Sequence, residues 1–233
     1  MSISIIIPTL NEEAHIGGLL QYLQQDPSFS QVSEILVVDG NSEDQTRSVA
    51  QNHGAEVLIS PIRNRGKQMN LGAAHARGSI LYFLHADTFP PEGFAQKINE
   101  AVTKGTRCGC FRLRFNWSHW FLQANSWFTR FNFRVFRYGD QSLFVAGDLF
   151  SNLNGFKEEM KLFEDQDMVA RLKSICSFEV LPGYVVTSAR KYRKNGPYRL
   201  QLVYFLLFFM FILGFSQRFL EQTYRNLIPH PMM

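Results

Sequence analysis

The sequence lacks the two common glycine-rich phosphate-binding motifs. Neither G-x-G-x-x-G nor G-x-x-x-x-G-K-[ST] follows the first apolar segment. Both motifs work by placing backbone N–H groups against a phosphate at the start of a helix. Their absence disfavours a dinucleotide-binding enzyme of the usual kind and a Walker-type nucleotide triphosphatase. No period of 20–50 residues recurs either, which excludes a repeat architecture.

Cysteine is also scarce. The 233 residues contain three, Cys108, Cys110 and Cys176, which is an odd number without the spacing of a disulfide framework. No second Cys or His pair stands near enough to complete a zinc site. Because Cys108 and Cys110 lie in an alternating, strand-like run, we expect buried thiols. The opening segment MSISIIIPTLNEE has no basic region and reaches Pro8 and two acidic residues too soon for a signal peptide. These features predict a reducing, cytoplasmic setting.

Charge is modest. The 24 Lys and Arg exceed the 20 Asp and Glu by four, which gives a net charge of +4. Such a balance suits anionic partners such as nucleotides or a membrane surface, and it is too small to indicate a nucleic-acid partner. The composition is 45% hydrophobic and 19% charged, which is typical of a globular protein with a substantial core.

Four apolar, strand-like segments alternate with helical segments in the first part of the chain. The strand-like segments are residues 2–7, 34–38, 56–60 and 79–84. The segment after the first strand has Ile16, Leu19, Leu20 and Leu23 on one helical face. This alternation predicts an α/β fold with a parallel sheet and helices on its faces.

Two stretches have the spacing of helix capping boxes. Thr9-x-x-Glu12 precedes the first helical segment, and Ser42-x-x-Gln45 precedes the second. We therefore expect the hydroxyls of Thr9 and Ser42 to cap those helices.

Polar side chains follow each of the four strands. Because parallel strands end at the same edge of a sheet, these side chains should meet where open α/β sheets bind ligands. A lone Asp-Thr pair after a strand is equally compatible with an ordinary turn, so the prediction depends on the coincidence of four clusters. The clusters are Thr9, Asn11 and Glu12; Asp39, Asn41 and Ser42; Arg63 and Arg65; and His85 and Asp87.

The second part of the chain is less regular. Residues 109–115 alternate as a strand, and an aromatic and Arg-rich stretch follows at 119–141. Further on, Met168, Leu172 and Ile175 share a helical face. The acidic residues Glu164, Asp165 and Asp167 stand at the start of this helix, where carboxylates are favourable without any function. A structural role for them therefore stays open.

Together, six motifs resemble the family 2 glycosyltransferases, which have the GT-A fold. The resemblance runs from residue 3 to about residue 195. It implies a Rossmann-like nucleotide-binding half with a mainly parallel central sheet at 1–90, an acceptor half at 91–195, and a C-terminal apolar helical segment at 196–233. The motifs are IIIPTLNEE near the start, ILVVDGNSEDQT at 35–46, RGKQMNLGAAHARG at 65–78, LHADT at 84–88, GDQSLFV at 139–145 and FEDQDMVARL at 163–172.

The resemblance implies an inverting transfer of a sugar from a nucleotide-diphosphate donor, with Mn²⁺ or Mg²⁺ as cofactor. Asp87 matches the metal-binding carboxylate that ends the D-x-D motif of the family. His85 replaces the first acid of that motif, which leaves contact with the ribose, the diphosphate or the metal open for it. The residues implied for nucleotide-sugar binding are Pro8, Thr9, Glu12, Asp39, Asn41, Arg65, His85, Ala86 and Asp87.

More specific roles follow from the same resemblance. Asp39 is expected to accept a hydrogen bond from the base, and Arg65, or Arg63 in its place, to contact the diphosphate or base. Asp165 matches the general base that deprotonates the acceptor hydroxyl, with Asp167 as second candidate.

The basic segment RKYRKNG at 190–196 stands where the family often carries Q-x-x-R-W. It has neither Gln nor Trp, so we do not expect a processive polymer synthase. Arg190 and Arg193 are implied diphosphate contacts, and a solvated basic turn is an equal alternative.

Residues 202–215 contain no charge and are flanked by Lys and Arg. A helix of this length spans roughly 21 Å, which is short of the ~30 Å hydrocarbon core of a bilayer. Three alternatives are a buried or oligomer-forming helix, an anchor lying on a membrane surface, and a true span, which the length disfavours. An acceptor linked to a lipid would suit a peripheral location on the inner face of the cell membrane.

Two other functions compete with sugar transfer. A nucleotidyltransferase should carry a glycine-rich basic loop after the first strand, where this chain has TLNEE. A non-catalytic, membrane-associated nucleotide-sugar-binding protein would not need Asp39, Asp87 and Asp165.

Overall fold

The structure is a computed structural model that describes residues 1–133 and 141–228. Four parallel strands form one half of its sheet, in the order β3-β2-β1-β4. Every residue of β1 and β4 is buried, as expected for strands covered on both faces. The four predicted strands are confirmed, with bounds β1 (Ile3–Thr9), β2 (Val32–Asp39), β3 (Glu56–Ile59) and β4 (Ile80–Phe83).

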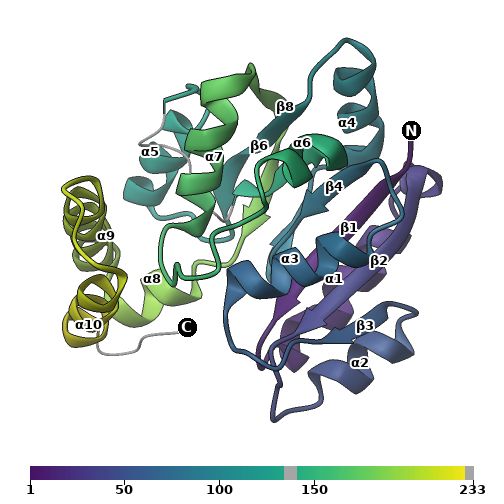
Figure 1. The fold of residues 1–233 in the computed structure, drawn as a ribbon. Helices are drawn as coiled ribbons and strands as arrows, with labels where there is room; N and C mark the ends of the chain where they lie inside the picture. The colour runs from purple at the N-terminus through teal and green to yellow at the C-terminus, as the bar shows by residue number, and fades with distance from the viewer. Residues whose placement is uncertain (134–140, 229–233) are drawn as a thin grey trace.

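Helices connect these strands and cover both faces of the sheet (Figure 1). Helices α1 (Glu13–Gln24) and α2 (Thr46–Asn52) lie on one face, and α3 (Arg65–His75) lies on the other. Alternate residues of β1 pack against the helices on opposite faces of the sheet, because successive side chains of a strand point in opposite directions. Gly72 of α3 is required by this packing, since a Cβ there would lie 2.5 Å from the side chain of Ile6.

Four further strands extend the sheet. β7 (Leu143–Ala146) pairs antiparallel with β4, and β6 (Cys108–Phe115) pairs antiparallel with β7. β8 (Phe178–Thr187) runs parallel to β6, and the short β5 (Thr88–Phe89) ends the sheet antiparallel to β8. The complete order is β3-β2-β1-β4-β7-β6-β8-β5.

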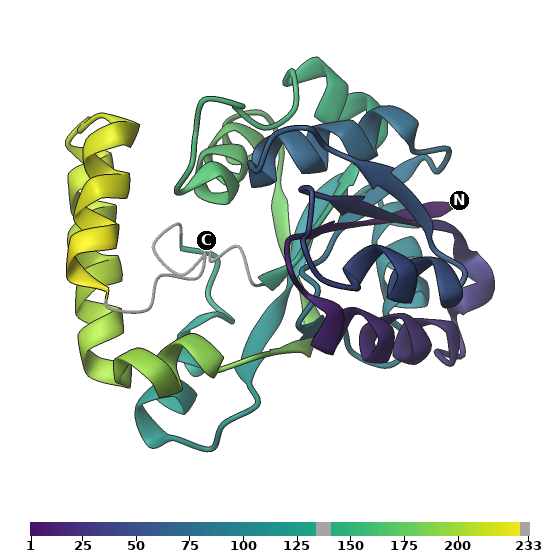
Figure 2. The same ribbon diagram turned by 90° about the horizontal axis from the view of Figure 1, so that it is seen from below.

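The remaining helices of this body continue the two layers (Figure 2). α4 (Phe94–Thr103) joins the face of α1, with the short 3-10 turn η1 (Phe29–Gln31) beside it. α6 (Gly147–Asn152) and α7 (Glu164–Ile175) join the face of α3. α5 (Trp120–Phe128) packs against β6 beyond the short segment that pairs with β7. Thr129, just after α5, accepts a hydrogen bond there from the backbone N–H of Leu113 at 3.0 Å.

The C-terminal part forms a separate cluster of helices. α8 (Arg190–Asn195) leads into the antiparallel pair α9 (Pro197–Ile212) and α10 (Gln217–Leu227), which stands beside the sheet in Figure 2. Their inner faces and α5 share a third hydrophobic core, built from Leu122, Ala189, Tyr192, Leu200, Val203, Leu207, Leu220, Tyr224 and Ile228.

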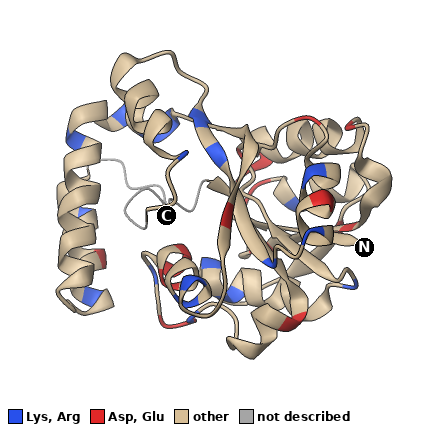
Figure 3. Ribbon diagram, turned by 90° about the horizontal axis from the view of Figure 1, so that it is seen from above, with Lys and Arg blue, Asp and Glu red and all other residues tan. Residues whose placement is uncertain are grey.

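The predicted apolar helix is therefore present, with one face buried and one exposed. Leu202, Phe209 and Leu213 on the outer face are 69%, 61% and 75% exposed. Within residues 1–133 and 141–228, no helix combines the length and the apolar character needed to cross a membrane. Figure 3 shows acidic and basic positions spread over both helix layers and over the C-terminal pair.

Both predicted capping boxes are wrong. The residues at the N-caps of α1 and α2 are Glu12 and Gln45, and neither side chain makes a capping hydrogen bond. The hydroxyls of Thr9 and Ser42 instead donate to the carboxylate of Asp39. The reason is physical: Asp39 is fully buried, and a buried carboxylate is destabilising unless donors surround it.

Candidate active site

The loops after β1 and β2 are tied to each other at the carboxyl edge of the sheet. The backbone N–H of Asn11 donates to Ser42 Oγ at 2.9 Å, and that of Glu12 donates to Thr46 Oγ1 at 2.8 Å. Asn11 and Asn41 have φ angles of 54° and 65°, a left-handed conformation that asparagine tolerates better than most residues. Both loops are thus held in unusual conformations where the sequence predicts a ligand.

Asp39 is the centre of this network. Its side chain is 0% exposed, accepts hydrogen bonds from Ser42 N at 2.8 Å and from Thr9 Oγ1 at 3.2 Å, and lies 3.8 Å from Arg47 Nε. The predicted site residue Pro8 is also buried, beside Val38 of β2. Asp39 therefore fixes the positions of both loops.

Gln68 was not predicted to belong to the site. Its Nε2 donates to the carbonyl oxygens of Thr9 at 2.8 Å and Val38 at 2.7 Å, so it joins the ends of β1 and β2 from α3. It lies within the RGKQMN segment of the sequence, but nothing in that pattern marks a buried amide that bonds two strands. Gly40 gives this amide room, because a Cβ there would come within 3.1 Å of it.

Asp44 links the start of α2 to the start of α1 through hydrogen bonds. Burial alone would raise the pKa of its carboxyl group. Hydrogen bonds from the side chain and backbone of Thr46 and from the backbone of Glu13 outweigh that effect, and the pKa lies below its ordinary value. The carboxylate is therefore ionised at neutral pH and accepts from both helices.

Arg190 bridges two predicted site carboxylates. Its Nε lies 3.2 Å from Asp87 Oδ2, and its Nη1 donates to Glu12 Oε2 at 2.9 Å. His15 lies 3.1 Å from the same Glu12 oxygen. Arg190 and the two carboxylates are largely buried, with exposed fractions of 23% for the Arg190 side chain and 16% for each carboxylate side chain. The structure thus brings together Glu12, Asp87 and Arg190 from the segments that follow β1, β4 and β8.

These carboxylates fit a divalent cation that is shared with a bound phosphate. Among the described residues, no three or more His, Cys, Asp or Glu side chains gather into a metal site. Asp87 would offer an oxygen ligand, and a cationic group, the guanidinium of Arg190, already lies between it and Glu12. Magnesium and manganese commonly use one or two carboxylates and take their other ligands from phosphate and water. His85 and the buried Ala86 complete the loop before Asp87.

The acidic cluster at the start of α7 faces Arg65. Nη1 of Arg65 donates to Glu164 at 3.0 Å and lies 3.8 Å from Asp165 Oδ2. Glu164 is 3% exposed and Asp165 is 18% exposed, so Asp165 is the more accessible of the two. Phe163, just before them, has a φ of 67°, which is rare for a bulky side chain, and stacks on Phe211 of α9 with ring centres 5.2 Å apart.

The alternative residues occupy other positions. Asp167 pairs with Lys157 at 2.8 Å and with Arg171 at 2.7 Å. Arg63 pairs with the exposed Glu43. Arg193 lies over the ring of Trp117, 5.5 Å from its centre, rather than beside Asp87. Of the GDQSLFV motif, positions 139 and 140 lie outside the described residues.

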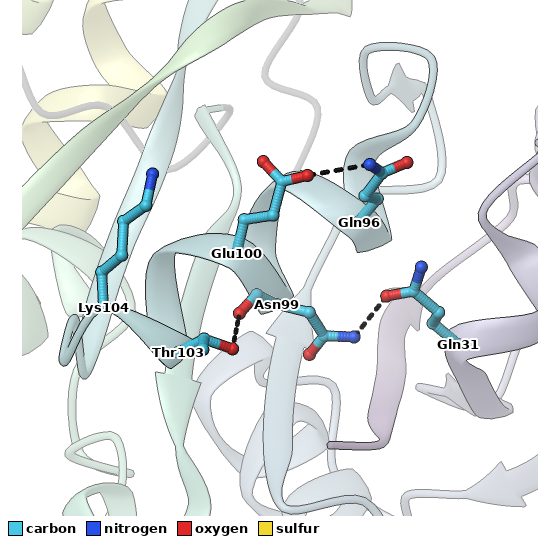
Figure 4. Close-up of a pocket in the computed structure, with 6 residues that line it drawn as sticks. All are labelled: Gln31, Gln96, Asn99, Glu100, Thr103 and Lys104. Carbon is cyan, nitrogen blue, oxygen red and sulfur yellow. Dashed lines mark hydrogen bonds between the residues drawn. The ribbon is translucent and has the colours of Figure 1, made fainter.

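A small cavity of about 370 Å³ lies elsewhere on the molecule, between η1 and α4 (Figure 4). Its polar side chains bond to one another: Asn99 donates to Gln31 at 2.6 Å and Gln96 donates to Glu100 at 2.8 Å. Asn99 also contacts the carbonyl of Met1 at 3.4 Å, which places the cavity at the amino end of β1. It is therefore at the opposite edge from the residues described above.

Comparison with known proteins identifies the family. The model of the family described as "Glycosyl transferase family 2" matches residues 4–157. The chain therefore belongs to the family 2 glycosyltransferases, whose members use nucleotide-sugar donors.

Individual relatives match a shorter segment. An uncharacterized glycosyltransferase of Mycobacterium tuberculosis is 30% identical over 104 residues, which is 45% of this chain and 45% of that protein. The human dolichyl-phosphate beta-glucosyltransferase is 33% identical over 101 residues, 36% of this chain and 31% of that protein. The match thus spans less than half the length of these curated relatives.

A solved structure shares the fold over nearly the whole chain. The mannosyltransferase PcManGT from Pyrobaculum calidifontis, in complex with GDP-Man and Mn²⁺, superposes with a TM-score of 0.68 at 17% identity. The alignment covers 99% of this chain and 65% of that one. The fold is therefore GT-A, as the resemblance implied.

Proposed function

We propose that this protein is an inverting glycosyltransferase that moves a sugar from a nucleotide-diphosphate donor to an acceptor hydroxyl. One observation carries the proposal: Glu12, Asp87 and Arg190 meet at the carboxyl edge of the sheet in a family 2 chain. Family membership favours this function over a nucleotidyltransferase or a non-catalytic binding protein.

The nucleotide would bind over the two cross-linked loops in the first half of the chain, residues 1–90. Thr9, Glu12 and Asn41 border that place. Asp39 is proposed to contact the base, which would compete with the hydroxyls of Thr9 and Ser42 for its oxygens. A ligand that binds here meets loops already fixed by hydrogen bonds, so little conformational entropy is lost on binding.

The diphosphate would lie beside Asp87 and Arg190. Asp87 would hold Mn²⁺ or Mg²⁺, which supplies positive charge where the leaving diphosphate becomes more negative. Arg190 lies at the same carboxylates and adds a fixed positive charge. His85, two residues before Asp87, is proposed to contact the donor. Arg193 remains a weaker candidate for a diphosphate contact because its guanidinium lies over Trp117.

Asp165 is the proposed general base. Its carboxylate would take the proton of the acceptor hydroxyl while that oxygen forms a bond to the anomeric carbon. The bond from that carbon to the diphosphate breaks at the same time, on the opposite side, which inverts the configuration. Asp167 is less suited, because its two oxygens are held by Lys157 and Arg171. Arg65, which lies beside Asp165, is proposed to contact the diphosphate or the base.

A lipid-linked acceptor is proposed for the second half of the chain, residues 91–195. The outer face of α9 is apolar and exposed, and basic residues stand at both ends of the α9–α10 pair, as on helices that lie on anionic membranes. A human relative is a dolichyl-phosphate beta-glucosyltransferase by name. The enzyme would then work at the inner face of the cell membrane. A homo-oligomer formed through residues 202–215 is the alternative, and light scattering with and without anionic vesicles distinguishes the two.

The function is tested by thermal shift with a panel of UDP- and GDP-sugars, with and without Mn²⁺. A ligand that binds only the folded state raises the melting temperature, and we expect a larger rise when Mn²⁺ is present. Asp87→Ala should abolish that increment. The products separate the competing enzymes, because a glycosyltransferase releases a nucleoside diphosphate and a nucleotidyltransferase releases pyrophosphate. Absence of stabilisation by every nucleotide would contradict the proposal.

A further inference from the structure

A larger cavity, of about 650 Å³, lies between α5 and the ends of β6 and β8. α5 packs against β6, which is the neighbour of β8 in the sheet. Among the described residues, the lining contains aromatic rings, amides and arginines and no acidic residue. The residues are Leu113, Arg114, Phe115, Asn116, Trp117, Ser118, Gln123, Ser126, Trp127, Arg130 and Tyr184.

The register of the sheet places this cavity next to the candidate active site. Thr88, which follows Asp87, pairs with Thr187 of β8, and Thr187 pairs with Phe115 of β6. The next residue, Asn116, donates its N–H to the carbonyl of Thr187 at 3.0 Å. Neighbouring strands lie about 4.8 Å apart, so the cavity wall begins roughly 10 Å from Asp87.

The cavity is positively charged. Arg114 and Arg130 line it, and Arg112 and Arg193 lie at its border, over the rings of Tyr184 and Trp117. None of these four arginines forms an ion pair with an Asp or Glu in the described parts of the chain. Cations without counter-charge around a recess attract anions.

Arg114 and Arg130 lie over aromatic rings. The guanidinium of Arg114 is 4.6 Å from the centre of the Tyr184 ring, and that of Arg130 is 4.4 Å from the centre of the Trp127 ring. Stacking of this kind restrains the planar guanidinium and leaves donors at its edge for a phosphate or carboxylate. The rings themselves offer apolar surface beside those donors.

An unsatisfied hydroxyl points to a ligand independently of the charges. Ser126 of α5 lines the cavity, is 7% exposed, and its Oγ has no hydrogen-bond partner among the described residues. A buried polar group that has no hydrogen-bond partner destabilises the folded protein. A bound molecule with an acceptor oxygen would satisfy it.

We propose that this cavity binds the acceptor through an anionic group, a phosphate or a carboxylate, with an adjoining ring or apolar part against Trp127 and Tyr184. The inference rests on the proposed function, because it assigns the substrate class of the same enzyme. The anion would be held about 10 Å from Asp87, which leaves room for the attacking hydroxyl on the far part of the acceptor.

Intrinsic fluorescence reports on this cavity. The chain has three tryptophans, of which Trp117 and Trp127 line the cavity and Trp120 begins α5. The probe is phenyl phosphate, with benzyl alcohol as its neutral counterpart, and the titrations are made in a saturating nucleoside diphosphate so that the donor site is already filled. We expect a saturable change with phenyl phosphate and none with benzyl alcohol. An equal response to both compounds, or no saturable response, would overturn the proposal.

Variants locate the binding. Arg114→Gln and Arg130→Gln should each weaken phenyl phosphate binding about tenfold, which is about 1.4 kcal/mol. Arg114→Lys, which keeps the charge, should recover part of the loss. Arg107→Gln is the matched control, because Arg107 is an exposed arginine that pairs with Asp148 outside the cavity. Circular dichroism checks folding. Unchanged binding in both cavity variants, or equal loss in the control, would contradict the assignment.

The two proposals fail in different ways. If UDP or GDP stabilises the protein and phenyl phosphate gives no response, the anion site is wrong and the transferase proposal stands. If no nucleotide stabilises the protein, the transferase proposal fails, and the fluorescence titration without nucleotide then shows whether the cavity binds anions on its own.

Discussion

At the scale of single residues, the partners of a carboxylate decide its role. Asp165 and Asp167 stand two residues apart at the start of one helix, where both carboxylates interact favourably with the positive end of the helix dipole. Asp167 has both oxygens in ion pairs with Lys157 and Arg171, whereas Asp165 lies beside Arg65 at 3.8 Å. The sequence left these two residues as alternatives, and the contacts favour Asp165.

We predict that Asp165→Asn cuts sugar transfer by roughly 10²–10⁴-fold, the usual contribution of a positioned base. The amide keeps the size of the side chain but cannot take a proton, so nucleotide binding and the melting temperature should change little. Steady-state transfer and thermal shift measure the two effects. Asp167→Asn is the control and should lower the melting temperature with little effect on the rate. The opposite pattern would make Asp167 the base.

Arg190 should compete with a metal ion for Asp87. Its guanidinium occupies the position between Glu12 and Asp87, and Arg190→Gln removes that positive charge from between the two carboxylates. We predict that Mn²⁺ alone, without nucleotide, raises the melting temperature of this variant more than that of the wild type. The Arg193→Gln variant is the control and should behave like the wild type. Equal responses in all three proteins would show that Arg190 does not restrict metal binding.

At the scale of elements, sequence periodicity predicted the strands and helices whose patterns lie within one segment of the chain. The first four strands and α1 follow from their apolar patterns, and the alternation at 109–115 marks β6. β8 was not predicted, because Pro182 and Gly183 interrupt its pattern and proline normally argues against an inner strand. The register shift opposite Phe111 and Arg112 accommodates these two residues, and Gly183 has a φ of 109°.

The sequence named candidate residues for the site but could not predict the contacts between them. The resemblance named Glu12, Asp87 and Arg190, but a bridge between residues 178 positions apart depends on how β8 returns to the sheet. The positions of Gln68 and of the Thr9 and Ser42 hydroxyls were missed for the same reason, since side chains that bond a neighbouring loop carry no periodic signal.

The packing of α9 against Phe163 should affect the chemical step. We predict that Phe211→Ala, which removes the ring stacked on Phe163, lowers transfer about tenfold while donor binding is kept, because the turn before Asp165 loses its support. Phe209→Ala is the control, since Phe209 is 61% exposed on the outer face of the same helix. It should leave transfer to a water-soluble acceptor unchanged. Equal transfer rates in the two variants would show that the packing of α9 does not support the position of Asp165.

The outer face of α9 gives a separate prediction. Phe209→Ser combined with Leu213→Ser should reduce cosedimentation with vesicles that contain anionic lipid, because both side chains are exposed and apolar. Nucleotide binding should be unaffected. Two results would contradict membrane binding by this face. One is cosedimentation that does not decrease. The other is an oligomeric wild type that becomes monomeric in the double variant, which would make this face an oligomer interface.

At the scale of the whole molecule, the three hydrophobic cores are unequal. Two of them share the sheet and support each other through its strands. The third lies mainly on α5, α8, α9 and α10 and, among the described residues, has fewer buried members than either of the other two. Regions with fewer buried apolar contacts open more readily than the centre of a domain.

We therefore predict that this protein loses its activity at a lower temperature than the one at which its sheet unfolds. As temperature rises, the third core opens first, and Phe163 loses the ring that holds it in a left-handed turn while the sheet is still folded. Activity would then disappear several degrees below the main calorimetric transition, and it would return on cooling because the sheet, which carries the donor loops, has not melted. The C-terminal helices would set the upper working temperature of the enzyme, and the sheet would set only the temperature at which the loss becomes permanent.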